Sequence, residues 1–144
     1  MKLNSVVRRT TAGRHWCGPA ALSAITGISY DRIRRELADL MGKRSVTGTP
    51  IWAALLLLRK HGIKAYNESW VIKADQKERG NRPTLARWLR IRPDRKALYL
   101  VHLTGHLVVV KGNKFVDNHT MTPVWLKDSP HRRKRVMCAW RIER

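Results

Sequence analysis

The strongest constraint on the fold is a change of hydrophobic pattern near residue 97. Before it, apolar residues recur at spacings of three and four, which is typical of helices with one buried face. After it come short apolar runs and strict alternation, separated by the turn signals Thr104-Gly105 and Gly112-Asn113. The sequence therefore predicts an α+β fold, with helices first and an antiparallel sheet packed against them.

Start and stop signals place the individual elements. Capping side chains and prolines begin the predicted helices, and glycines or prolines end them. Four helices are expected, from Cys17 to a stop at Gly27, from a cap at Asp31 to Gly42, from Thr49-Pro50 to Leu58, and from Pro83-Thr84 to Pro93-Asp94. The polar stretch 73–82 is expected to be a loop. Strands are expected over 63–66, 97–103, 106–110, 114–117 and 136–143.

Length and composition set the protein class. The chain has 144 residues, of which 43% are hydrophobic, and this suits one domain spanning 1–144 with a real core. The longest apolar run, 51–58, is far shorter than the roughly 20 residues that span a bilayer. Two cysteines and the absence of an N-terminal apolar segment predict a cytoplasmic protein with reduced thiols.

The charge is strongly unbalanced. Thirty Lys and Arg residues against ten Asp and Glu give a formal net charge of +20, so polyanions are expected to be attracted. Nucleic acid and acidic proteins are the candidate partners, although the same residues are also compatible with ordinary solvated faces. Because no homeodomain, zinc-finger or ribonucleoprotein signature is present, any such binding would be directed at the backbone and sensitive to salt.

Cys17 stands at the start of the first predicted helix. Free backbone N–H groups and the helix dipole stabilise a thiolate at such a position, which makes the thiol more nucleophilic. A free cysteine is also among the residue types that proteins most often bury as a small apolar group. The position therefore allows two interpretations, a reactive thiol or a core residue.

A base for such a thiol is available in the predicted hairpin. His106 begins one strand, and Asp117-Asn118 end the next strand of the same hairpin. Because the first residue of one strand and the last of its partner lie side by side, Asp117 or Asn118 can reach the ring of His106. A Cys, His, Asp constellation is the arrangement that nucleophilic catalysis requires, although Asp117 is equally suited to a local turn.

The order of these segments resembles the papain-like cysteine peptidases, in particular the compact branch that includes bacteriocin leader-processing peptidases and similar bacterial and phage domains. The resemblance runs through most of the chain and rests on five stretches: Cys17-Gly18-Pro19-Ala20-Ala21-Leu22, Thr49-Pro50 with the Leu-rich helix up to Gly62, the strand Ala97–Leu103, Gly105-His106-Leu107-Val108-Val109, and Phe115-Val116-Asp117-Asn118.

The resemblance implies a role for each residue. It implies a papain-like fold in which Cys17 is the nucleophile, His106 the general base and later acid, and Asp117 the residue that orients His106, with Asn118 as the alternative. It also implies cleavage of an amide bond in a peptide or protein substrate, through a thioester. Members of the family carry a glutamine before the cysteine that stabilises the oxyanion, and this chain has none there. The candidate substitutes are Thr11, Arg14 and His15.

Other residues receive structural assignments. Cys138 alternates with core positions of the last strand and is expected to be buried, whereas Trp16 and Trp125 are candidates for a substrate groove. No cofactor and no metal site is expected, because His102 and His106 lack a partner at metal-ligand spacing.

Two functional hypotheses follow from the sequence: a cysteine peptidase, or a weak or inactive papain-like scaffold that binds nucleic acid or another polyanion.

Overall fold

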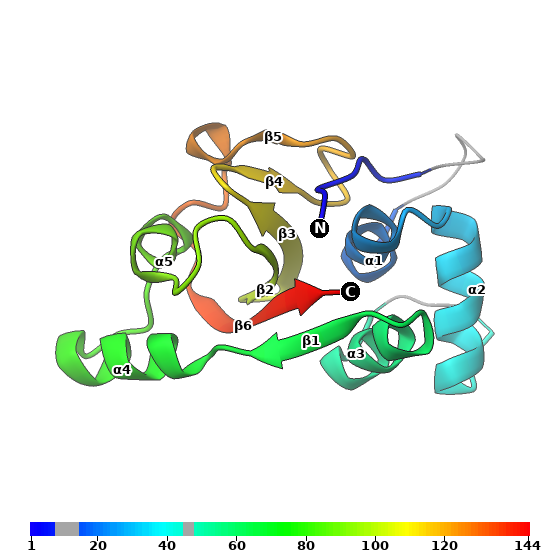
Figure 1. Cartoon of the computed structure of the whole chain (residues 1–144), viewed down its shortest axis with the longest axis horizontal. Coiled ribbons are helices and arrows are strands. Elements are labelled where there is room, and N and C mark those ends of the chain that lie inside the picture. The colour runs from blue at the N-terminus through cyan, green and yellow to red at the C-terminus, as the bar shows by residue number, and fades with distance from the viewer. Residues whose placement is uncertain (8–14, 45–47) are drawn as a thin grey trace.

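The computed structural model describes residues 1–7, 15–44 and 48–144, and within them the chain is an α+β protein (Figure 1). Five α-helices and one antiparallel sheet of six strands account for most of these residues. In chain order the elements are α1 (Cys17–Thr26), α2 (Tyr30–Met41), α3 (Ile51–Lys60), β1 (Lys64–Asn67), α4 (Trp70–Arg79), α5 (Leu85–Ile91), β2 (Leu98–Leu103), β3 (His106–Lys111), β4 (Lys114–Val116), β5 (Val124–Trp125), a 3₁₀ turn (Leu126–Asp128) and β6 (Val136–Glu143).

The sheet has the strand order β1-β6-β2-β3-β4-β5. The hairpin of β2 and β3 is in register from Leu98 opposite Lys111 to Leu103 opposite His106. The last strand, β6, inserts between β1 and β2, and its register with β2 shifts at His102 and Leu103. The C-terminal strand therefore ties the helical half of the chain to the hairpin that carries His106.

Helices cover both faces of the sheet (Figure 1). One core joins α1, α2 and α3 to residues such as Leu100 and Val109, and a second core joins α4 and α5 to residues such as Tyr99 and Val108. Alternate residues of β2 and β3 point to opposite faces, so both faces of these strands are buried. This explains why they are continuous apolar runs and do not alternate with polar residues.

Most predicted elements are present, with small differences at their ends. The helix α1 is buried from Gly18 to Ile25, as its uniformly apolar composition predicts. The N-cap of α2 is Ser29, whose hydroxyl accepts the Arg32 N–H, and not Asp31. Pro50 is itself the N-cap of α3. No helix among the described residues is long and apolar enough to cross a membrane.

The expectation of a loop over 73–82 was wrong, because α4 occupies most of it. This helix buries only Val71, Ile72 and Asp75, so its sequence has little apolar periodicity. Asp75 is held by Arg87 of α5 through hydrogen bonds of 2.7 and 3.0 Å, which compensates its burial. A polar helix docked by an ion pair was missed because the pairing is tertiary. The short strand β5 was also not expected.

Candidate functional site

Cys17 is the first residue of α1, and its position is fixed by the next residue. A Cβ added at Gly18 would lie 2.0 Å from Thr49 Oγ1, so only glycine permits this contact between α1 and the segment before α3. Cys17 itself is partly exposed. The close packing therefore holds the thiol at a surface-accessible helix start, where free backbone N–H groups remain.

His106 is the first residue of β3 and follows Gly105, which has the positive φ of 69° that this turn requires. Its ring is buried, with 7% of the side chain exposed. The Cys17 thiol lies close enough for the two groups to shift each other's pKa, although the residues are far apart in the sequence. The tertiary packing of α1 on β3 brings them together.

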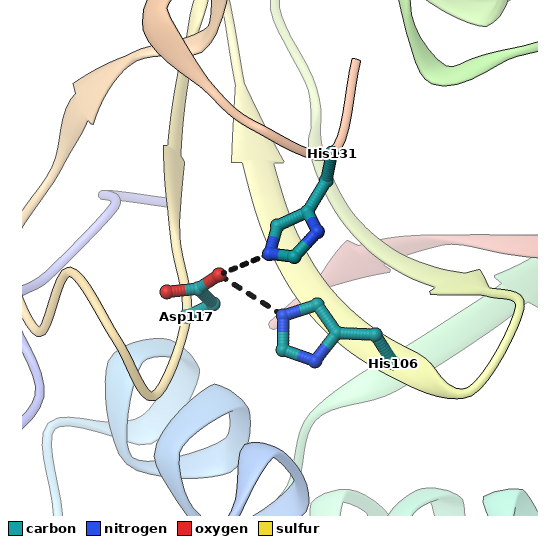
Figure 2. Close-up of side chains that lie close together, drawn as sticks. All are labelled: His106, Asp117 and His131. Atoms are coloured by element: carbon teal, nitrogen blue, oxygen red, sulfur yellow. Dashed lines mark hydrogen bonds and ion pairs between the residues drawn. The ribbon is translucent and has the colours of Figure 1, made fainter. Parts of the chain in front are cut away.

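Asp117 follows β4 directly and faces His106 (Figure 2). One carboxylate oxygen, Oδ2, lies 3.0 Å from His106 Nε2. The other, Oδ1, accepts the backbone N–H groups of His119 and Thr120 at 2.9 and 2.8 Å. Because Asp117 occupies Nε2, the remaining ring nitrogen Nδ1 is available to the thiol. The carboxylate is held rigidly by the turn that follows β4.

The three groups shift one another's pKa values. Burial alone would raise the pKa of Cys17, but the hydrogen bond and charge of His106 and the backbone N–H groups of Leu107 and Gly18 outweigh it and lower that pKa. Burial opposes a charged His106, yet Asp117 and Cys17 raise its pKa to about 9. Burial likewise opposes a charged Asp117, but its hydrogen bonds hold its pKa at about 2. These shifts favour a thiolate beside an imidazolium.

His131 is a neighbour that the sequence analysis missed. Its Nε2 lies 3.4 Å from the same Oδ2 of Asp117, and its ring centroid is 4.5 Å from that of His106 (Figure 2). Burial, followed by the positive charge of His106, lowers its pKa. In sequence it only begins a basic run, 131–135, and no local pattern links that run to the hairpin. The contact depends on the path of the chain between β5 and β6.

The two candidates for the orienting residue separate in space. Asp117 bonds to His106, whereas Asn118 donates from Nδ2 to the His15 carbonyl oxygen at 2.9 Å. Asn118 thus attaches the segment before Cys17 to the hairpin. Of the oxyanion candidates, Thr11 and Arg14 lie outside the described residues. The ring of His15 packs edge-on against Tyr30, with centroids 4.6 Å apart.

The remaining candidates lie apart from this cluster. Cys138 is partly buried in β6 and packs at the margin of the core that contains α1, α2 and α3. Trp125 is 52% exposed and lines a separate pocket with Arg90 and Arg132, which contains none of Cys17, His106 and Asp117. Trp125, a sequence candidate for lining the substrate groove, thus lines a pocket apart from these three residues.

Three comparisons complete the description of the site. Neither a family model, nor a curated protein, nor a solved structure matches the chain. The chemistry of the cluster must therefore be inferred from its own geometry. A thiol, a base and a carboxylate arranged in this way can perform acyl transfer. The base and the carboxylate, together with His131, also offer ligand atoms to a cation.

Proposed function

We propose that this chain is a papain-like thiol hydrolase that cleaves an amide bond in a peptide or protein, with Cys17, His106 and Asp117 as its catalytic triad. The observation that carries the proposal is the contact of Cys17 at the start of α1 with His106 at the start of β3, and of His106 with Asp117 after β4. The start of α1 supplies the nucleophile, and the distant hairpin of β3 and β4 supplies the base and the orienting group, in the arrangement that such catalysis needs.

In the proposed first step, the Cys17 thiolate attacks the carbonyl carbon of the substrate. The S–C bond forms, and the carbonyl electron pair moves to oxygen to give a tetrahedral oxyanion. When the C–N bond breaks, His106 donates its Nδ1 proton to the leaving amine, and a thioester remains on Cys17. Asp117 holds the ring through Nε2 and stabilises its positive charge before that transfer.

In the second step, water hydrolyses the thioester. His106, now neutral, accepts a proton from water as the oxygen attacks, and the C–S bond breaks to release the acid. The backbone N–H of Cys17 is a candidate oxyanion donor, because the first N–H groups of a helix have no partner within it. The absence of the usual glutamine makes that donor more important in this chain.

Cleavage of a peptide library by the wild-type chain, read by mass spectrometry, tests the proposal. We expect Cys17→Ala to abolish cleavage, since the nucleophile is lost, whereas Cys138→Ala removes an equivalent thiol elsewhere and should leave cleavage intact. Cleavage that survives Cys17→Ala would refute the proposal. Absence of cleavage by wild type, together with no preferential alkylation of Cys17 over Cys138, would refute it equally.

A second candidate function, nucleic-acid binding, is favoured by a basic pocket between α5 and β5. Its polar lining is Arg90, Asn113, Trp125, Lys127 and Arg132, and we use "basic pocket" for these five residues. Its apolar floor is formed by Ala86, Leu89 and Leu126. Exposed cations beside an exposed indole are suited to phosphates and a stacked base. The pocket supports a single-stranded nucleic acid as ligand.

Arg92, in an adjoining pocket, strengthens this second candidate. It is 6% exposed, and no carboxylate among the described residues forms an ion pair with it. Its Nη1 donates to the Gly112 carbonyl at 2.8 Å, but its buried Nε has no hydrogen-bond partner there. An arginine that forms no ion pair with a carboxylate is favourable for an anion such as phosphate. Arg90 and Arg95 line the same adjoining pocket.

Binding of oligo-dT, measured by fluorescence anisotropy, tests the second function. We expect Trp125→Ala to weaken binding by about 1–3 kcal/mol, the usual contribution of one stacked base. Trp70→Ala removes a comparably exposed indole on α4 and should not change the affinity. Equal affinity of all three proteins, or preference for poly-glutamate over oligo-dT, would argue against nucleic acid as the ligand.

A further inference from the structure

His106, Asp117 and His131 direct three ligand atoms toward one point. Both Nε2 atoms face Oδ2 of Asp117, at 3.0 Å from His106 and 3.4 Å from His131 (Figure 2). All three ligand atoms lie within 4.8 Å of one another. The residues come from β3, from the turn after β4 and from the segment before β6, so the fold itself gathers them. We name these three residues the histidine-aspartate cluster.

The spacing is close to that of a tetrahedral metal site. Zinc binds imidazole nitrogen and carboxylate oxygen at 2.0–2.2 Å, so ligand atoms in a tetrahedral site are separated by about 3.3 Å. Two of the three separations in the cluster already have values near this one. The third separation, between the two histidine nitrogens, is no more than 4.8 Å.

The surroundings also resemble those of built metal sites. The carboxylate is oriented from behind by the backbone N–H groups of His119 and Thr120, so Oδ2 is left for the ligand. His106 and Asp117 are buried, and the His131 side chain is 13% exposed. Such outer hydrogen bonds fix the ligands of metal sites before the metal arrives. Partial exposure of His131 provides an entry path.

We propose that the histidine-aspartate cluster is a binding site for a borderline divalent transition cation, with Zn²⁺ as the representative ion. Two imidazoles and one carboxylate suit this class of ion, whereas Mg²⁺ and Ca²⁺ require mainly oxygen ligands. On binding, the metal replaces the proton on His106 Nε2, which passes to the buffer, and water fills the fourth position. The site shares His106 and Asp117 with the proposed triad, but its existence does not depend on the peptidase proposal or on the basic pocket.

A consequence for activity does rest on the proposed function. A ring whose Nε2 holds a metal can give up its Nδ1 proton only by becoming an imidazolate, so it is a much weaker acid than imidazolium. Protonation of the leaving amine by His106 would then fail. Zinc is therefore an inhibitor of the proposed peptidase, and the cluster makes hydrolysis sensitive to the free zinc concentration.

Calorimetric titration of the untagged chain with ZnCl₂, in the Cys17→Ser background, tests the site without any need for catalysis. We expect one zinc per chain. His131→Gln or Asp117→Asn should weaken binding by more than tenfold, because loss of an outer-shell group alone typically costs about 10–100-fold. His61→Gln is the matched control, since His61 pairs with Glu36 at 2.8 Å without a second histidine. The zinc affinity of this variant should equal that of the Cys17→Ser chain.

Co²⁺ absorption provides a readout that does not depend on the stability of the variants. Cobalt bound by the cluster should give visible bands of a tetrahedral site without the sulfur-to-cobalt charge-transfer band that thiolate ligation produces. Failure of the parent chain to bind either ion, unchanged affinity in folded His131→Gln, or a thiolate band from the chain with Cys17 intact would overturn the proposal. Each of these outcomes is a measurement of metal binding that needs no hydrolysis of a substrate, so none of them depends on the peptidase function.

Discussion

The proposed triad of Cys17, His106 and Asp117 and the basic pocket concentrate charge in opposite ways. In the proposed triad, His106 and Asp117 are 7% and 1% exposed and neutralise each other at hydrogen-bonding distance. In the basic pocket, Arg90, Lys127 and Arg132 are exposed, have the same sign and lie beside an exposed Trp125. The first arrangement stabilises particular protonation states over a few ångströms. The second creates a field that attracts ligands over a distance.

This difference determines how each region responds to solvent. Salt screens charges in water beyond about 8 Å at physiological ionic strength but affects buried contacting pairs much less. The reactivity of Cys17 should therefore depend on individual partners and weakly on ionic strength. Ligand binding at the basic pocket should depend on total charge and strongly on ionic strength.

The largest expected effect is that of salt. If a strand places about four phosphates on the basic surface, its affinity should fall several hundredfold between about 50 and 500 mM salt, because the slope is about −0.7 per phosphate for single strands. Over the same range, the alkylation rate of Cys17 should change by less than about threefold, since its partners are in contact. Oligo-dT anisotropy and iodoacetamide labelling in the same buffers measure both. Equal salt dependence in the two assays would show that the two regions do not differ in their response to salt.

Removal of the buried charge should have the next largest effect. Asp117→Asn keeps the shape of the side chain but not the carboxylate that raises the pKa of His106, so less thiolate forms. We expect the alkylation rate of Cys17 at neutral pH to fall by about 10–100-fold, since one pKa unit changes the population tenfold. Asp75→Asn neutralises another buried carboxylate, paired with Arg87, and should leave the rate unchanged. An unaltered alkylation rate in Asp117→Asn would show that the Asp117 carboxylate does not promote formation of the Cys17 thiolate.

A steric change beside the thiol should destabilise the close contact that positions Cys17, which the basic pocket does not share. Gly18→Ala places a Cβ 2.0 Å from Thr49 Oγ1, and such overpacking lowers the free energy of unfolding by about 1–3 kcal/mol. Denaturant unfolding measures the loss. Thr49→Gly removes the opposing atoms, so the double variant should recover most of it. Additive losses in the double variant would show that the contact is not what requires glycine.

The smallest effect is expected for single cations of the basic pocket. Arg132→Ala should weaken oligo-dT binding by about threefold to tenfold and lower the salt slope by about one unit. Arg34→Ala removes an equally exposed charge from α2, which lies at the other side of the molecule (Figure 1), and should have less effect. Identical losses in both variants would mean that net charge, and not the basic pocket, determines binding.

Local patterns predicted the elements that bury regular apolar faces. The buried helix after Cys17, the hairpin of β2 and β3, and the alternating last strand all follow from spacing and turn residues. The α4 helix was not predicted, because it buries only two apolar residues and its third buried residue, Asp75, is paired with Arg87 of another helix. Sequence patterns report contacts within one element or between neighbouring strands of a hairpin, but not contacts between separate helices.

The same limit applies to the candidate site. His106 and Asp117 belong to one hairpin, so their contact follows from strand pairing, and their juxtaposition could be anticipated. His131 belongs to the irregular segment before β6, whose backbone accepts hydrogen bonds from Leu85 and Ala86 of α5. Its contact with Asp117 could not be anticipated from the sequence. The basic pocket was foreseen only as excess charge, because arginines from separate segments meet there.

The pH dependence of Cys17 alkylation tests the central claim, that this thiol is paired with His106, most directly. Iodoacetamide labelling from about pH 5 to pH 9, with a chelator present and a free cysteine peptide of ordinary pKa, about 8.5, as internal reference, gives the relative rate by mass spectrometry. We predict that Cys17 keeps reacting below neutral pH while the reference slows about tenfold per unit. A Cys17 rate that falls in parallel with the reference would contradict the pairing, and with it the catalytic triad.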